Sequence, residues 1–99
     1  MTSVFHPEAR DEFRAAVEYY NEAEPGLGVD FAGEVEAAVG LIEAFPNPWT
    51  EVAFGIRRCL VRRYPFALLY GIECDMVVIY AVMHTRRDPD YWKSRLDLA

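Results

Sequence analysis

The N-terminal half of the chain contains two stretches in which apolar residues recur every three or four positions. In the first, residues 7–21, the apolar positions are Ala9, Phe13, Ala16, Val17 and Tyr20. In the second, after a turn-forming Pro25-Gly26-Leu27-Gly28, they are Phe31, Val35, Ala38, Ile42 and Phe45. This spacing places each set on one face of an amphipathic helix. Because the connection is short, we predict an antiparallel pair of helices.

Prolines mark the two ends of this helical region. Pro7 fits the first position of a helix, where a backbone N–H would have no partner in any case. Pro46 and Pro48 end the second helix, because neither can donate a backbone hydrogen bond and each disfavours helical geometry in the residue before it. A short first strand is expected at residues 3–5.

The C-terminal half predicts four strands, at about residues 52–54, 56–63, 66–73 and 76–84. The turn signals that separate them are Gly55, Tyr64-Pro65 and Cys74-Asp75. Such short connections require antiparallel neighbours, since a parallel return needs about a dozen residues or more.

Together these elements predict an α+β fold. A helical hairpin packs on one face of a four-stranded antiparallel sheet, with a short N-terminal strand before it. After the last strand, Asp88 as N-cap and Pro89 as first residue begin a short C-terminal helix that runs to Leu96. The length of 99 residues fits a single domain, residues 1–99, and a content of 53% apolar and 26% charged residues is typical of a folded globule.

The formal net charge of −6 is unevenly distributed. Residues 1–56 hold eleven acidic and two basic residues, whereas residues 57–99 hold eight basic and five acidic ones. A local basic patch can still attract an anionic partner within a Debye length of about 8 to 10 Å. The acidity of the whole chain nevertheless weakens any function directed at nucleic acid.

No sequence feature indicates a membrane span, a secretion signal or a metal site. The apolar runs are shorter than the roughly 18 residues that a span needs, and the N-terminus has neither a basic nor an apolar signal region. We therefore expect a cytoplasmic protein. Cys59 and Cys74 lack the spacing of zinc ligands and are interpreted as small core residues in a reducing compartment. No cofactor is predicted.

The segment from His84 to Lys93 carries four basic and two aromatic side chains directly after an apolar strand. Residues 76–83 are so continuously apolar that we expect this strand in the centre of the sheet. It would then deliver His84, Arg86 and Arg87 to the sheet edge, where any chemistry or docking is predicted to lie. The acidic residues of the two helices are interpreted as a solvated face; they are Glu12, Glu18, Glu22, Glu34 and Glu36.

Several marks along the chain, in this order, resemble the RelE/ParE superfamily of type II toxins. They are Tyr19-Tyr20, Pro25-Gly26-Leu27-Gly28, Phe31, the strand from Arg57 to Arg63, Tyr64-Pro65-Phe66, Tyr70 and the final His84-Thr85-Arg86-Arg87-Asp88-Pro89-Asp90-Tyr91-Trp92. The resemblance covers nearly the whole chain and implies a RelE-like fold. It also implies the toxin of a type II toxin-antitoxin, or plasmid stabilisation, system. Such a toxin is neutralised by a cognate antitoxin, with which it can form a hetero-oligomer.

Members of the superfamily use two mechanisms, and the resemblance leaves both open. Gyrase-directed members bind and inhibit DNA gyrase without chemistry of their own. Ribosome-dependent members cut mRNA without metal, through attack of a 2′-hydroxyl on the adjacent phosphate. We favour binding and inhibition, because the chain is acidic and lacks the sheet lysines of the ribonucleases. A third possibility is a binder that has lost its target and retains only the antitoxin.

If the chain is an mRNA endonuclease, the resemblance places Arg62, Arg86 and Tyr91 near its catalytic positions. Such a reaction needs cations for the phosphorane charge, a base for the 2′-hydroxyl and an acid for the leaving oxygen. Arg58 and Arg62 lie four residues apart on one predicted strand and share a face, and Arg86 follows the neighbouring strand.

If the chain is an inhibitor, the residues predicted to bind the target are Arg58, His84, Arg87 and Trp92. Each also has a structural interpretation. The arginines can solvate an edge strand and discourage edge-to-edge pairing, and His84 can be a hydrogen-bonded structural residue. For Trp92, packing of the last helix onto the sheet is favoured. Tyr91 could stack on an RNA base, but the sequence does not decide its role.

Overall fold

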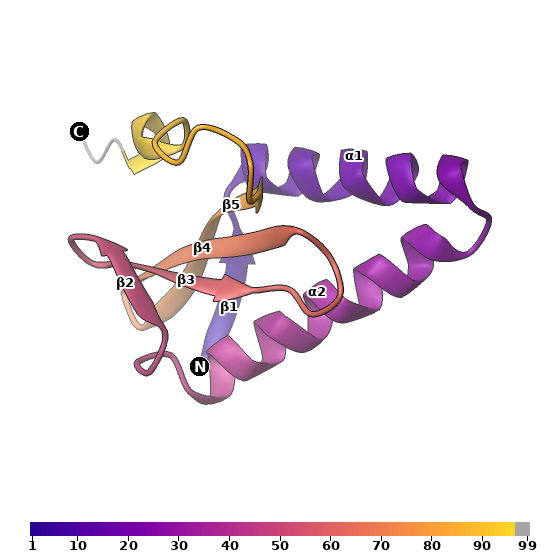
Figure 1. Cartoon of the computed structure of the whole chain (residues 1–99). Helices are drawn as coiled ribbons and strands as arrows, with labels where there is room; N and C mark the ends of the chain where they lie inside the picture. The colour runs from indigo at the N-terminus through magenta and orange to yellow at the C-terminus, as the bar shows by residue number, and fades with distance from the viewer. Residues whose placement is uncertain (97–99) are drawn as a thin grey trace.

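The computed structural model describes residues 1–96 as one sheet with a helical hairpin on one face (Figure 1). The chain begins with strand β1 (Thr2–Phe5) and continues through helices α1 (Pro7–Ala23) and α2 (Leu27–Ala44). Next come the strands β2 (Thr50–Ala53), β3 (Ile56–Leu60), β4 (Phe66–Glu73) and β5 (Met76–His84), followed by a 3-10 helix, η1 (Lys93–Leu96). No helix among residues 1–96 is both long and apolar enough to cross a membrane.

The sheet has five strands in the order β1-β5-β4-β3-β2, one more than the sequence predicts. The antiparallel meander from β2 to β5 is confirmed, as is the interior position of β5. β1 adds to the far side of β5 in parallel, with Val4 opposite Val78. Both helices and three strands separate β1 from β5 in the chain, so the rule that short connections make neighbours antiparallel does not apply to this pair.

Two predicted boundaries are wrong. β3 ends at Leu60 and does not reach Arg63, whose φ of 70° lies in the left-handed region and is incompatible with a strand. The helix predicted from Asp88 forms only its last part, η1. Asp88 caps a turn instead, because its Oδ1 accepts the Asp90 N–H at 2.9 Å.

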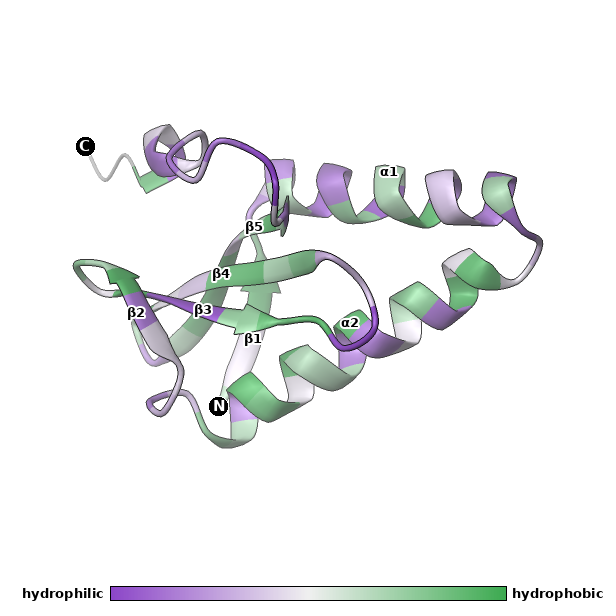
Figure 2. Cartoon of the chain, viewed as in Figure 1, coloured by the Kyte–Doolittle hydropathy of each residue, from purple (hydrophilic) through white to green (hydrophobic). Residues whose placement is uncertain are grey.

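Different parts of the chain bury the two faces of the sheet. Under the helices, Phe31 and Ile42 of α2 pack with Ile79 of β5. On the opposite face, Leu69 of β4 packs with Trp92 of the C-terminal segment. Figure 2 shows hydrophobic colour along β4 and much of α2. We call this cluster on the face away from the helices the second core. The C-terminal segment covers it, so the fold needs that segment.

A β-bulge lets β5 serve both cores. The pairing register shifts between Leu69 and Tyr70 of β4, which leaves Tyr80 of β5 as the extra residue. Tyr80 and Ala81 both belong to the second core, and Val82 returns to the core under the helices. The sequence does not predict this bulge, because β5 is apolar on both faces and its residues do not show which core each one faces.

Two residues predicted to be buried are exposed. Phe45 is 62% exposed, because α2 ends at Ala44 and the chain turns away from the core there. Cys74 lies exposed in the β4–β5 turn with a φ of 51°. Cys59 is buried as predicted, and burial raises the pKa of its thiol to about 11.

Close packing of the two helices depends on Gly28. Its N–H donates to Oδ1 of Asn21 in α1 at 2.7 Å. A β-carbon at position 28 would lie 2.3 Å from the Val17 carbonyl oxygen, far inside van der Waals contact. Only glycine lets α2 begin this close to α1.

Gly28→Ala should lower the free energy of unfolding by about 2–3 kcal/mol, because the added methyl group forces two backbones apart. Gly33→Ala is the matched control on the same helix, since nothing lies within 4 Å of its missing β-carbon. It should raise stability by about 0.5–1 kcal/mol through helix propensity. Urea unfolding followed by circular dichroism measures both, and equal effects would show that the helices are not in tight contact at Gly28.

Candidate functional site

The basic segment, residues 84–93, leaves the sheet beside the β3–β4 connection. His84 at the end of β5 pairs with Phe66, and the Thr85 N–H donates to the Pro65 carbonyl at 2.9 Å. The Nδ1 atom of His84 accepts the Arg86 N–H at 3.1 Å, and the Arg86 side chain is exposed. β5 therefore delivers this segment to an end of the sheet, as its sequence predicts.

One carboxylate, that of Glu12 in α1, holds the basic segment against the helix. Only 15% of its side chain is exposed. Its oxygens accept the Val82 N–H at 3.0 Å and the Tyr91 hydroxyl at 2.6 Å. Arg95 donates to both oxygens, at 2.9 and 2.8 Å. The prediction that Glu12 belongs to a solvated helix face is wrong.

Arg95, which the sequence analysis missed, is the partner that makes this burial possible. Its side chain is 7% exposed and also donates to the Tyr80 carbonyl at 2.9 Å. Two charges removed from water stabilise each other only when their remaining hydrogen-bonding positions are filled, which is the case here. A weak signal exists in the sequence: Glu12 lies three residues after Ala9 and four before Ala16, at the border of the buried helix face.

This cluster sets the protonation of Glu12 and Tyr91. Burial alone would raise the pKa of Glu12, but hydrogen bonds from Arg95, Tyr91 and the Val82 N–H outweigh it, and the pKa lies below its ordinary value. Burial, and then the hydrogen bond to Glu12, raise the pKa of Tyr91 well above its ordinary value. The Arg87 guanidinium lies over the Tyr91 ring, 3.6 Å from its centroid. Tyr91 is therefore a neutral phenol whose hydroxyl is already engaged.

Two arginines near β3 have structural roles. Arg57 donates to the Trp49 carbonyl at 2.7 Å. Arg63 forms ion pairs with Asp30 and Glu34 of α2 and so ties the β3–β4 connection to the helical hairpin. Glu34 is consequently not a purely solvated residue either.

The other two arginines of this region, Arg58 and Arg62, are exposed. Arg58 lies two residues from Ile56 and shares its face of the sheet, away from the helices. Arg62 follows Val61, whose N–H donates to the Phe66 carbonyl at 2.9 Å. This places Arg62 near the same end of the sheet as Arg86, with β4 between the two strands that they follow. Arg62 and Arg86 thus lie near one end of the sheet on either side of β4, whereas the Tyr91 hydroxyl donates to Glu12.

Trp92 and His84, which the sequence also predicts to bind the target, have different surroundings. Trp92 is 1% exposed in the second core, and its indole N–H donates to the Pro89 carbonyl at 2.6 Å. The packing interpretation of Trp92 is confirmed, and its buried ring offers no surface to a target. His84 is half-buried beside Phe66, with ring centroids 5.3 Å apart.

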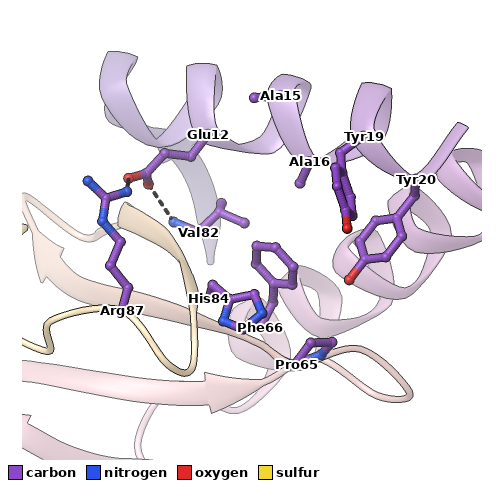
Figure 3. Close-up of a pocket in the computed structure, with 10 residues that line it drawn as sticks. All are labelled: Glu12, Ala15, Ala16, Tyr19, Tyr20, Pro65, Phe66, Val82, His84 and Arg87. Carbon is purple, nitrogen blue, oxygen red and sulfur yellow. Dashed lines mark hydrogen bonds and ion pairs between the residues drawn. The ribbon is translucent and has the colours of Figure 1, made fainter. Parts of the chain in front are cut away.

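A cavity of about 550 Å³ lies between α1 and the adjoining ends of β4 and β5 (Figure 3). Its apolar and aromatic lining residues include Ala15, Ala16, Tyr19, Tyr20, Phe66 and Val82. Its charged or ionisable neighbours are Glu12, His84 and Arg87, so two of the predicted target-binding residues line it. Among residues 1–96, no group of three His, Cys, Asp or Glu side chains is placed to hold a metal ion.

A family model that describes the ParE toxin of the type II toxin-antitoxin system parDE matches residues 4–89. The chain belongs to the ParE toxin family. Among solved structures, a chain of the chromosomal ParDE system of P. aeruginosa is similar, with a TM-score of 0.76 and 14% sequence identity over 87% of this chain and 97% of that one. That likeness shows the fold alone. No curated protein is a significant sequence match.

Membership of the ParE family confirms the RelE/ParE resemblance and implies a cognate antitoxin. The site of this ParE-family toxin combines exposed guanidinium groups with a carboxylate cluster that is closed on itself. Exposed guanidinium groups bind anions and carboxylates but do not exchange protons near neutral pH. The geometry is therefore better suited to recognition than to acid–base chemistry.

Glu12→Gln should lower the free energy of unfolding by about 2–4 kcal/mol, because it leaves the buried Arg95 guanidinium without a counter-charge. Glu18→Gln, at an exposed position of the same helix, should change it by less than about 0.5 kcal/mol. Urea unfolding at neutral pH compares the two. A small effect of Glu12→Gln would mean that Arg95 is satisfied by water instead.

The loss of unfolding free energy in Glu12→Gln should depend on pH. The folded pKa of Glu12 lies below the ordinary value of 4.5, so its stabilising contribution is complete above that value and is lost as pH falls through the folded pKa. The difference in unfolding free energy between the wild type and Glu12→Gln should be constant above about pH 6 and shrink below about pH 4. A difference that grows on acidification would contradict this assignment.

Proposed function

We propose that this ParE-family toxin acts by binding and inhibiting DNA gyrase and has no ribonuclease activity of its own. The observation that carries the proposal is the state of Tyr91. Its hydroxyl donates to Glu12 at 2.6 Å, and its pKa is raised. To serve as a general acid it would have to abandon a charged acceptor, and Glu12, with its lowered pKa, is a weak base.

The other polar groups support the same proposal. Ribonuclease chemistry of the superfamily's kind needs a base and an acid in addition to cations. Arg62 and Arg86 supply positive charge only. The single lysine, Lys93, lies outside the sheet and pairs with Asp90 at 3.0 Å. The position of Arg62 and Arg86 near one end of the sheet is the observation that keeps the endonuclease as the alternative.

The exposed cations form a surface suited to a protein target. Arg58 shares its face of β3 with Leu60, which is itself exposed. Arg62 lies beyond the end of β3, so the predicted shared strand face of Arg58 and Arg62 is not formed. Arg86 lies at the same sheet end as Arg62. Arginine is enriched in protein interfaces, where its stem packs and its fork binds carboxylates or carbonyls. The acidic helical half of the chain would repel nucleic acid from the opposite side.

Purified toxin should block supercoiling of a relaxed plasmid by gyrase, or trap cleaved DNA, and leave translation in a cell-free system intact. The reason is that the surface offers recognition without a free acid–base pair. Cleavage of mRNA with unaffected supercoiling would contradict gyrase inhibition and favour the endonuclease. Inactivity in both assays, with antitoxin binding preserved, would favour a binder that has lost its target.

Arg86→Ala should weaken gyrase inhibition about 5- to 10-fold, an effect that shrinks in high salt because the contact is exposed. Arg14→Ala, an exposed arginine of α1 far in sequence from the basic segment, is the charge-matched control and should have no effect. Tyr91→Phe should leave inhibition within about twofold but lower stability by about 1–2 kcal/mol, since it removes a hydrogen bond to a carboxylate. An endonuclease would instead lose about 10²- to 10³-fold in cleavage rate with Arg86→Ala.

A further inference from the structure

The hairpin formed by β2 and β3 presents an uncovered aromatic side chain at its tip. Among residues 1–96, Phe54 is the one large apolar residue that is fully exposed. Val52 and Leu60 of the same hairpin are 42% and 57% exposed. Figure 2 shows the tip in hydrophobic colour, and Figure 1 shows it on the side of the sheet away from the turn that joins the helices. Exposed apolar side chains gathered on one element are typical of a contact site.

The tip is held in one conformation. Gly55, with a φ of 74°, closes the turn, and its N–H donates to Oε2 of Glu51 at 2.9 Å. Ile56, the next residue, is buried in the second core. Strand β4 lies close to the turn, since a β-carbon on Gly71 would be 3.1 Å from the Gly55 carbonyl oxygen. Phe54 is therefore presented on a fixed turn, and binding of its side chain costs little backbone entropy.

The side chains of the hairpin, and not its backbone edge, are suited to docking. β2 is an edge strand, but its pairing with β3 shifts register between Glu51 and Ala53. Such a bulge and a charged residue on the edge both discourage the addition of a further strand. Edge-to-edge pairing with a second copy of the chain, or with an extended peptide, is therefore disfavoured here.

The tip is continuous with the cations assigned to target binding. Arg58 and Leu60 lie along β3 on the face of the sheet away from the helices. The five residues of β3 span about 16 Å, after which the chain reaches Arg62. The tip and these arginines thus fit within one protein interface of standard size, which buries about 800 Å² per partner. An aromatic side chain accompanied by arginines is typical of the residues that dominate binding energy in such interfaces.

The surroundings of Phe54 favour an apolar pocket in a protein over a nucleic-acid base. Val52 and Leu60 are aliphatic, and Phe54 is the sole aromatic residue of the hairpin. Surfaces that bind single strands instead use several aromatic rings, on which successive bases stack. The Glu51 carboxylate beside the turn would also repel a phosphate chain.

We propose that Phe54 is the apolar anchor of the toxin's contact with its target. Its ring enters an apolar pocket of the target protein, beside carboxylates that pair with Arg58. The inference rests on the proposed function, because it takes the target to be a protein, and it places the centre of the contact at the β2–β3 hairpin. Arg62 and Arg86 then lie toward one side of the interface, where exposed charges orient the partner while the buried ring supplies most of the affinity.

Phe54→Ser tests the anchor against Phe45→Ser, a matched change at a phenylalanine that is 62% exposed after α2. In the supercoiling assay, Phe54→Ser should raise the half-inhibitory concentration of purified toxin about 10-fold or more, because the apolar contact is lost. Phe45→Ser should stay within about twofold of the wild type. Both variants should keep the melting temperature within about 2 °C of the wild type, since both side chains are exposed.

Phe54→Leu separates an apolar pocket from base stacking. A pocket accepts the leucine side chain, so inhibition should stay within about threefold of the wild type. A stacking contact needs the flat ring, and Phe54→Leu would then lose as much activity as Phe54→Ser. Equal losses in these two variants would contradict an apolar protein pocket as the occupant.

Growth arrest on induced expression of the same variants separates this inference from the identity of the target. Phe54→Ser should relieve the arrest and Phe45→Ser should not, whichever protein is inhibited. If the wild type arrests growth with this pattern but does not block supercoiling, gyrase is the wrong target and the anchor stands. If the wild type blocks supercoiling and Phe54→Ser is as potent as Phe45→Ser, the anchor is wrong and gyrase inhibition stands.

Two further results would overturn the anchor. One is a wild type that neither arrests growth nor blocks supercoiling, which would contradict the proposed function as well. The other is found by sedimentation of the free toxin. If Phe54→Ser converts a wild-type dimer to a monomer and leaves inhibition unchanged, the tip belongs to an interface between two copies of this chain.

Discussion

The ion pair between Glu12 and Arg95 is the interaction on which the position of the basic segment, residues 84–93, depends. Both side chains are largely buried, at 15% and 7% exposure, and they lie 83 residues apart in the chain. A buried carboxylate or guanidinium without its partner is strongly destabilising, so each charge requires the other to be in place. Tyr91 and the Val82 N–H fill the remaining positions on the carboxylate. The segment that contains Tyr91 and Arg95 is thus fixed to α1 by a polar cluster and not by packing alone.

The position of the basic segment follows from that attachment. The segment between β5 and Arg95 is held at both ends, which fixes the turn that presents Arg86 and Arg87. The same attachment holds Trp92 against the face of the sheet that lies away from the helices. The same cluster engages the Tyr91 hydroxyl, the group that a ribonuclease of this superfamily would need. One interaction therefore completes the fold, orients the basic segment and disfavours acid–base catalysis.

Local patterns in the sequence carry most of the fold. Apolar spacing predicts both helices, and turn signals predict the antiparallel meander. The parallel pairing of β1 with β5 depends on a contact between distant segments, and no local pattern encodes it. The bulge at Tyr80 is invisible for a different reason, because β5 is apolar on both faces and either register looks alike.

The candidate site is predicted in part. The position of His84, Arg86 and Arg87 follows from the strand that precedes them. Glu12 is misassigned because a charged residue on a helix is usually solvated, and its burial depends on a guanidinium that arrives from the other end of the chain. The cavity beside Tyr19 and Tyr20 is likewise a product of tertiary packing.

A double-mutant cycle between Glu12 and Arg95 is the measurement that tests the central claim most directly. The free energies of unfolding of wild type, Glu12→Gln, Arg95→Gln and the double variant give the coupling between the two side chains. A coupling energy of about 2 kcal/mol or more is expected for a buried, doubly hydrogen-bonded pair. Additive effects, with a coupling below about 0.5 kcal/mol, would show that the pair does not hold the C-terminal segment in place.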